Sequence, residues 1–225
     1  VNEAQLLQRS LLRGWELPAG AVAVALSPDQ QHIFASGADG QIRQWNLGTG
    51  EQVRVLTAGQ PIAELTVANN GQVTAAACMD GKVRLWKPDG SALPDCEAKV
   101  AVRSVSLSGD GLRVAASGVD GQVRVFEVAT GLLLETFAEH APAQGAVGVR
   151  FLADNLSLVS AGGDGTVWLQ KVAAQRTVPL QSGKLRGLAS LNNAASLLVI
   201  RENGTAAQLN ATTAAEERIF APDRK

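Results

Sequence analysis

A short turn signal recurs along this chain about every 40 residues, and this spacing limits the folds that the chain can adopt. Each copy joins an Asp-Gly or Asn-Gly pair to a run with apolar or aromatic residues at mostly alternate positions. The four clear copies and a fainter fifth are DGQIRQW from Asp39, DGKVRLW from Asp80, DGQVRVF from Asp120, DGTVWLQ from Asp164 and NGTAAQL from Asn203. Such a pair ahead of alternating residues is the strongest local signal of a tight β-hairpin. The recurrence predicts a repeat protein in which each unit packs against its neighbours to complete a core.

Each unit carries the sequence signals of four short strands. The first strands alternate apolar residues and are expected at Ala21–Leu26, Ile62–Val67, Val102–Leu107, Val147–Phe151 and Leu185–Leu191. A polar turn precedes a second strand of small residues, expected at Ile33–Gly37, Val73–Cys78, Val114–Gly118, Leu156–Gly162 and Leu197–Arg201. The third strand follows the hairpin turn, and a Thr-Gly or Pro-Asp-Gly turn leads to a fourth. Because no stretch has convincing helical periodicity, we predict an all-β chain of four-stranded antiparallel propeller blades.

The repeats also predict where one blade ends and the next begins. The five expected blades are residues 17–57, 58–98, 99–139, 140–183 and 184–225. Residues 1–16 are expected to supply the fourth strand of a preceding or closing blade.

These units resemble the blades of the WD-repeat (WD40-like) β-propeller family, in a divergent form, over residues 17 to 221. They share an apolar first strand, an Ala-Ser-Gly second strand, the Asp-Gly pair and a Trp or Phe six residues after the Asp. In that family a His, a Ser or Thr, the turn Asp and the third-strand Trp form a hydrogen-bonded structural tetrad. By this resemblance the matching turn and tetrad residues are Asp39, Asp80, Asp120, Asp164, Ser36, Ser117, Trp45, Trp86 and His140. The resemblance implies a structural role for them. No copy holds all four members, because only His140 matches the His position and Phe126, Gln170 and Leu209 replace the Trp in the later copies.

An arginine recurs four residues after the turn Asp in three copies, as Arg43, Arg84 and Arg124. Positions four and six after the Asp lie on one face of a strand, so each Arg neighbours the Trp or Phe. The structural interpretation is a stem packed between blades, with its guanidinium near an aromatic ring or a carboxylate. The functional interpretation is a cationic stripe for anionic ligands, which the net charge of −1 does not favour.

Composition argues against several functions. The net charge of −1 and the lack of a Lys/Arg cluster predict no nucleic-acid binding. The apolar stretches are far too short for a membrane span, so we expect no membrane insertion. Two His and two Cys residues supply neither a catalytic triad nor metal-ligand spacing. We therefore expect no enzymatic activity, cofactor or metal, although a separated pair of carboxylates of the glycosidase type stays open.

The two ends of the chain leave the number of blades open. Ser10–Trp15 and Glu216–Phe220 each fit a fourth strand, so five first-second-third sets are accompanied by six candidate fourth strands. The chain is then part of a larger propeller of seven or eight blades, a closed ring of five, or an arc completed by another chain. We favour the first, because an unclosed arc leaves two apolar blade faces bare.

The sequence thus predicts a non-enzymatic protein-interaction or scaffold module that binds a partner through loops on one propeller face. By resemblance that face holds the Asp-Gly turns and the loops that enter each first strand. The candidate contact residues are Met79, Arg103, Val119, Glu139, His140 and Gln144. The alternative is a propeller that binds carbohydrate or another small ligand, for which equivalent loops offer few aromatic residues. The Ala-rich composition with more Arg than Lys predicts a bacterial source, and no residue pattern indicates a compartment.

Overall fold

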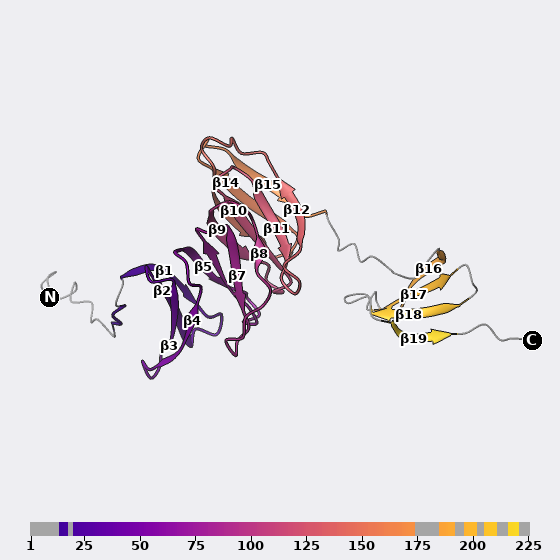
Figure 1. Cartoon of the computed structure of the whole chain (residues 1–225), viewed down its shortest axis with the longest axis horizontal. Coiled ribbons are helices and arrows are strands. Elements are labelled where there is room, and N and C mark those ends of the chain that lie inside the picture. Colours follow the sequence, from indigo (N-terminus) through magenta and orange to yellow (C-terminus); the bar gives the residue numbers. More distant parts are fainter. Residues whose placement is uncertain are drawn as a thin grey trace, which may run out of the picture. The chain divides into compact units, whose positions relative to one another are not determined.

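The computed structural model describes residues 14–17, 20–173, 185–191, 196–201, 205–210 and 216–220. The chain divides into two compact units, residues 1–175 and 176–225, and each unit is described by itself. The regular elements in the described ranges are all strands (Figure 1). These ranges contain no helix that is long and apolar enough to cross a membrane. The all-β prediction is confirmed.

The first unit contains four antiparallel sheets, each built from consecutive strands, and we call them blades one to four. Blade one consists of β1 (Ala21–Leu26), β2 (His32–Gly37), β3 (Gln41–Asn46) and β4 (Gln52–Thr57). Blade two consists of β5 (Ile62–Val67), β6 (Thr74–Cys78), β7 (Lys82–Trp86) and the short β8 (Cys96–Glu97). Blade three consists of β9 (Val102–Leu107), β10 (Arg113–Gly118), β11 (Val123–Glu127) and β12 (Leu133–Phe137). Blade four shows three strands, β13 (Ala146–Phe151), β14 (Ser157–Gly162) and β15 (Val167–Lys171).

The second unit holds one further sheet of the same design. Its strands are β16 (Leu185–Leu191), β17 (Ser196–Arg201), β18 (Ala206–Asn210) and β19 (Glu216–Phe220). They pair antiparallel in chain order, as the strands of the other sheets do. The recurring fold of about 40 residues therefore extends to the faint fifth copy of the turn signal.

Every first strand begins with a β-bulge against its second strand. In blade three, for example, Ser104 pairs with Ser117 and Val102 pairs with Gly118, so Arg103 is left out of the ladder. The first strands of blades one, two and four skip one residue in the same place. Bulges re-aim side chains and twist the strand. The bulged residue at the start of each first strand is therefore oriented differently from the rest of its strand. In blade three this residue is Arg103, which is exposed.

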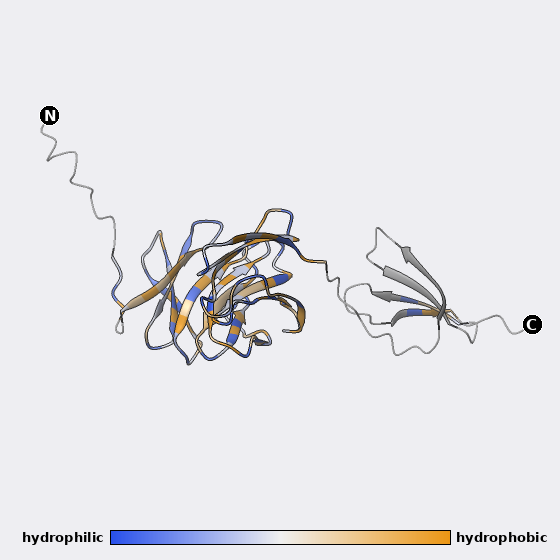
Figure 2. Ribbon diagram, turned by 90° about the horizontal axis from the view of Figure 1, so that it is seen from above, coloured by the Kyte–Doolittle hydropathy of each residue, from blue (hydrophilic) through white to orange (hydrophobic). Residues whose placement is uncertain are grey.

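Within the first unit the blades pack side by side through their first strands, since β1 contacts β5, β5 contacts β9 and β9 contacts β13. Hydrophobic residues (orange in Figure 2) run along these strands, and hydrophilic residues (blue) occupy many of the turns. Alternation along each strand explains this packing, because one row of side chains faces each neighbouring sheet. The interior of this unit is thus a series of interblade cores rather than a single cluster.

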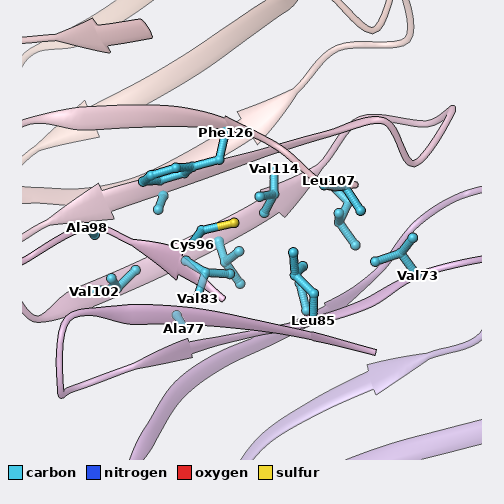
Figure 3. Close-up of a cluster of buried hydrophobic side chains, with 14 of the residues drawn as sticks. Val73, Ala77, Val83, Leu85, Cys96, Ala98, Val102, Leu107, Val114 and Phe126 are labelled. Atoms are coloured by element: carbon cyan, nitrogen blue, oxygen red, sulfur yellow. The ribbon is translucent and has the colours of Figure 1, made fainter. Parts of the chain in front are cut away.

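The largest of these cores lies between blades two and three (Figure 3). Leu85 and Val83 from β7 face Val114 from β10 and Phe126 from β11, and all four side chains are buried. The second strands contribute small residues, and Ala75, which is fully buried, is one of them. Small side chains at this position let neighbouring sheets approach closely, while the larger side chains of the third strands fill the remaining space.

A charged group connects blades that are not neighbours. Arg150 in β13 forms an ion pair with Glu64 in β5, across the first strand of the blade between them. Arg150 Nη1 also donates to Ser104 Oγ at 3.2 Å, and Glu64 Oε2 accepts the backbone N–H of Val105 at 2.8 Å. Blades two, three and four are therefore held together by one polar network at their first strands.

The strand predictions hold with shifts of about one residue at their ends, which is the usual uncertainty of strand limits. Three predictions fall partly or wholly outside the described residues. These are the fourth strand expected for residues 140–183, most of Ser10–Trp15 and the Asn203-Gly204 turn. Trp15 itself is described: its ring lies 6.1 Å from that of Trp45, and its indole N–H donates to the carbonyl of Gly50.

We predict that Leu85→Ala lowers the free energy of unfolding by about 2–5 kcal/mol, because it leaves a cavity in the core between blades two and three. Leu133→Ala is the matched control, since Leu133 is exposed on β12. The control is expected to change stability by less than about 1 kcal/mol. Guanidinium unfolding followed by circular dichroism measures both. Equal effects of the two substitutions would contradict this description of the core.

Candidate interaction surface at the Asp-Gly turns

The Asp-Gly turns between second and third strands share one geometry. In each turn Asp Oδ1 accepts the backbone N–H two residues ahead, at 3.1 Å in the Asp39 turn and 2.9 Å in the Asp164 turn. The following glycine has a positive φ, 71° at Gly40 and 89° at Gly81. A side chain at Gly40 would also lie 2.7 Å from the backbone nitrogen of Gln60. Glycine is therefore required both by the backbone conformation and by the close approach of the next loop.

In blades one to three the turn carboxylate is held by the arginine four residues later. The distances from Arg Nη2 to Asp Oδ2 are 2.7 Å for Arg43 and Asp39, 2.6 Å for Arg84 and Asp80, and 2.6 Å for Arg124 and Asp120. We call each such pair a clasp. The Arg84 guanidinium lowers the pKa of Asp80, and Arg43 does the same for Asp39. The recurring arginines thus bind carboxylates of their own hairpins, as the structural interpretation expects.

Blade four replaces the clasp with a histidine. Trp168 occupies the arginine position, and His140 from the loop before β13 approaches the turn instead. His140 Nε2 lies 2.8 Å from Ser160 Oγ, and His140 Nδ1 lies 3.1 Å from Thr166 Oγ1. The carboxylate of Asp164 accepts the Thr166 hydroxyl and the backbone N–H of Ala141, which lowers its pKa strongly. Polar groups from two loops therefore hold this turn.

His140 and the arginines occupy equivalent places. A Cβ atom added to Gly162 would lie 2.4 Å from both Asp164 Oδ1 and His140 Nδ1. A Cβ atom added to Gly118 would meet Asp120 Oδ1 at 2.4 Å and Arg124 Nη1 at 3.1 Å. The glycine two residues before the turn Asp thus makes room for whichever donor holds the carboxylate.

The serines predicted for the tetrad do not join it. Ser36 pairs with Ile42 and Ser117 with Val123, whereas Ser160 pairs with Trp168, one position further along the hairpin. Since side chains alternate between faces, Ser36 and Ser117 lie on the opposite strand face from the position of Ser160. Ser36 Oγ accepts the N–H of Ala23 at 3.1 Å, and Ser117 Oγ has no partner among the described residues.

Sequence reasoning missed Ser160, which contacts the histidine. Spacing was the available signal, because Ser160 precedes its turn Asp by four residues and Ser36 and Ser117 precede theirs by three. Gln170 completes the group in the position of the family's Trp. Its Oε1 accepts the Ser160 hydroxyl at 3.3 Å, and its Nε2 donates to Glu139 Oε2 at 2.7 Å. Trp45 and Trp86, the predicted tryptophans, are both buried, and Trp86 belongs to a core cluster that contains residues of blades one and two.

The candidate partner residues are placed unequally. Met79 is 49% exposed, and Arg103, Glu139 and Gln144 are also exposed. Val119 is half-buried, and His140 is only 3% exposed. His140 was predicted both as a tetrad residue and as a contact residue; the second prediction is corrected, because its ring is buried against Ser160 and Thr166. Arg103 Nη1 donates to the carbonyl of Gln144 at 3.3 Å, so the loops before blades three and four meet.

Backbone hydrogen bonds fix this surface further. In blades two to four the residue before the turn Asp donates to the loop that enters its blade: Met79 to Pro61 at 3.0 Å, and Val119 to Ala101 at 3.1 Å. Gly163 donates to Gly145 in the same way at 2.9 Å. Turns and entry loops therefore form one pre-ordered surface, which lowers the entropic cost of binding a partner.

The described residues contain no cluster of three or more His, Cys, Asp or Glu side chains that could hold a metal ion. Cys78 and Cys96 are both buried free thiols. Burial raises the pKa of Cys96 to about 12. Since the thiolate is the reactive form of cysteine, Cys96 is unsuited to nucleophilic chemistry.

Comparison with known proteins places the repeats in context. The family described as WD domain, G-beta repeat matches residues 10–46, 50–87 and 94–127. The outer membrane protein assembly factor BamB of Burkholderia pseudomallei is 29% identical over 61% of this chain and 36% of its own length. The cilia- and flagella-associated protein 52 of Sus scrofa is 28% identical over 60% of this chain and 23% of its own length. The small ribosomal subunit protein RACK1y of Oryza sativa is 31% identical over 47% of this chain and 34% of its own length.

Solved structures agree on the fold. The computationally designed Ika4 protein matches with a TM-score of 0.61 and 22% identity, over 72% of this chain and all of its own. The structure of U3-55K matches with a TM-score of 0.63 and 19% identity, over 93% of this chain and 66% of its own. The curated relatives above come from a bacterium, an animal and a plant, so they do not support the expected bacterial source. The chain matches about a quarter to a third of their lengths.

We predict that Gly162→Ala lowers the free energy of unfolding by about 1–3 kcal/mol, because the new methyl group would collide with His140 and Asp164. Gly148→Ala is the matched control in the same blade, since nothing lies within 4 Å of its added Cβ. The control is expected to change stability by less than about 1 kcal/mol. Denaturant midpoints of the two variants measure the difference. Unfolding of Gly162→Ala at the midpoint of the control would refute the packed position of His140.

Proposed function

We propose that this chain, whose residues 10–46, 50–87 and 94–127 are WD repeats, is a non-enzymatic scaffold that binds a protein partner through its Asp-Gly turns. WD repeats are in general protein-interaction modules. The finer proposal concerns the surface formed by the turns and entry loops of blades two, three and four. The observation that carries it is the exposure of Met79, Arg103 and Gln144 on a surface whose backbone is already fixed.

The hydrogen bonds and ion pairs of the turn carboxylates support a structural role for these carboxylates rather than a catalytic one. The carboxylates of the first three turns, Asp39, Asp80 and Asp120, accept hydrogen bonds from arginines of their own hairpins. The carboxylate of Asp164 accepts hydrogen bonds from Thr166 and Ala141. A carboxylate in such a pair is poorly available as a general base or a metal ligand. The side chains left for a partner are those beside the turns.

The exposed side chains around these turns have the mixture expected of a binding site. Met79 offers a flexible apolar group, and Arg103 offers a guanidinium beside a backbone carbonyl. Met and Arg are enriched at protein interfaces. Glu139, which accepts from Gln170, and Gln144 add polar groups at the edge of the same surface. The carbohydrate-binding alternative is less favoured, because Trp45 and Trp86 recur at equivalent positions but are buried.

The names of two relatives are consistent with a role in assemblies. One is an assembly factor for outer membrane proteins and another is a small ribosomal subunit protein. Both matches cover about a third of those proteins. We take from them the class of function, a module that joins other proteins, and not the identity of a partner.

We also propose that residues 17–57, 58–98, 99–139, 140–183 and 184–225 are five blades of a larger propeller, completed by further blades of the parent chain or of another copy. Support comes from the outer face of blade one, where Val22, Val24 and Leu26 form an exposed apolar row along β1. Val167 and Leu169 form a similar exposed row on β15. Apolar rows of this kind mark surfaces that are covered in the assembled protein.

The partner surface is tested with photo-reactive amino acids placed at Met79, at Gln144 and, as a control, at the exposed Leu133 on β12. We expect Met79 and Gln144 to crosslink to one and the same protein, and Leu133 to give no such product. The double substitution Met79→Ala and Arg103→Ala is then expected to weaken binding of that protein at least about tenfold. Unchanged affinity of the double variant would show that another face binds.

The larger propeller is tested by the reactivity of Val24→Cys in the full-length protein purified from its host. If another blade covers β1, we expect the new thiol to react at least about tenfold more slowly than the thiol of Leu133→Cys, an exposed control. The two native cysteines give little background because both are buried. Equal reactivity of the two introduced thiols would contradict the proposal.

A further inference from the structure

We propose that a cavity between blades one and two binds a carboxylate group presented by a peptide. This interblade cavity has a volume of about 610 Å³ and opens at the end of the sheets opposite the Asp-Gly turns. Its wall includes Gln44 and Thr74, the apolar side chains of Phe34 and Leu56, and the cations Arg54 and Lys87. Pockets for small ligands have volumes of this order. The site is separate from the surface proposed for the protein partner.

The repeats provide an internal comparison for this cavity. Gln44 lies five residues after its turn Asp, where blades two and three have Leu85 and Val125. Thr74 lies six residues before its turn Asp, where blades three and four have Val114 and Leu158. These pairs meet in consecutive interfaces: Leu85 with Val114 in one core cluster, and Val125 with Leu158 in another. The described part of the first unit contains three blade interfaces. Among them, only the interface between blades one and two has an amide and a hydroxyl in place of the apolar pair.

The two polar groups are buried without partners. Gln44 is 8% exposed and Thr74 is 6% exposed. Neither side chain makes a hydrogen bond with the residues that the structure describes. Arg54 adds a third case: its Nη1 donates to the carbonyl of Pro88 at 2.6 Å, but its buried Nε has no partner in the same part of the chain. A fully buried donor without a partner costs free energy, so Arg54 Nε calls for a ligand or ordered water. The polar atoms of Gln44 and Thr74 are not fully buried, so they line the cavity with hydrogen-bonding groups that a ligand can use.

Two cations at the cavity opening can bind an anionic group. Asp29 is the acidic residue of the wall, and its carboxylate already accepts the Ser27 hydroxyl and the N–H of Gln31, which lower its pKa. Lys87 is exposed at the rim and forms no ion pair among the described residues. Arg54 adds a second positive charge beside it. The pKa of Asp89, in the loop after β7, is lowered by hydrogen bonds from Ser91 and by the nearby charges of Lys87 and Arg54, so both cations already have a carboxylate close by. A ligand carboxylate would share these cations with Asp89.

The shape of the wall favours a carboxylate on a short aliphatic stem. Phe34 and Leu56 offer apolar surface, while Gln44, Thr74 and the amide of Asn69 offer hydrogen bonds; the Asn70 amide already bonds to Asp110 and Gln72. A Glu side chain combines these features, because its methylene groups fit the apolar wall and its oxygens accept from the amide, hydroxyl and ammonium donors. The open rim admits an extended peptide that presents such a side chain.

The proposal is tested by titrating the purified chain, followed by nuclear magnetic resonance, with the capped tripeptide acetyl-Gly-Glu-Gly-amide. The Gln analogue of this peptide and free glutarate are titrated in parallel. We expect saturable binding of the Glu peptide with a Kd of about 1 mM or lower, and at least tenfold weaker binding of the Gln analogue. No saturable binding of the Glu peptide would overturn the proposal. Binding of glutarate without binding of the Glu peptide would also overturn it, since a small carboxylate would then be the ligand.

The double variant Gln44→Leu and Thr74→Val copies the apolar pair found between blades two and three. We expect it to bind the Glu peptide at least tenfold more weakly and to unfold at a higher denaturant concentration, since buried polar groups are removed. Peptide binding equal to that of the unchanged protein would contradict the site.

Lys87→Gln provides a second variant at the exposed rim, with Lys171→Gln on β15 as its matched control. We expect Lys87→Gln to weaken binding of the Glu peptide at least threefold and the control variant to leave it unchanged. Equal affinities of the two variants for the peptide would also contradict the site.

Discussion

The carboxylate of each Asp-Gly turn must be held by a donor, and most of the surface described above depends on how this requirement is met. Three hairpins meet it internally, through an arginine of the third strand such as Arg84. In the fourth, Asp164 accepts hydrogen bonds from Thr166 and from the backbone N–H of Ala141, and His140 lies beside it in contact with Ser160 and Thr166. The turn is fixed in both cases, and in blade four a side-chain contact to Ala141 of the entry loop adds to the backbone hydrogen bonds that join turn and entry loop in blades two, three and four. Neighbouring loops such as those of Arg103 and Gln144 are then positioned on a rigid base.

Repetition makes departures from the pattern informative. Two of the three blade interfaces have an apolar pair, such as Leu85 and Val114, so the polar pair at the remaining interface differs from its own neighbours. Comparison of the blades also shows that Ser160 and Ser36 are not equivalent. The two serines lie in similar segments but at different register positions of their hairpins. Each blade thus acts as a reference for the next. The two proposed binding sites lie at opposite ends of the sheets, so one chain has room for two partners at once.

The sequence predicted the strands well because alternation and Asp-Gly turns are local properties. The recurring arginines were also understood locally, since Arg43 and Asp39 belong to one hairpin. His140 was predicted both as a structural tetrad residue and as a contact residue, and the sequence could not decide between them because its burial depends on a loop and a turn separated by more than twenty residues. The interblade cavity was missed for the same reason: Gln44 and Thr74 meet only when two blades pack. The sequence therefore predicted contacts within a blade but not the contacts between blades.

The ion pair between Glu64 and Arg150 has a consequence for how this protein can change over time. Its two partners belong to blades two and four, and Ser104 of the blade between them contributes to the same network. Gain or loss of a single repeat at blade three would separate the two charges and leave each without its counterpart. These three repeats are therefore expected to be inherited as a block, while repeats outside the block are freer to be added or removed.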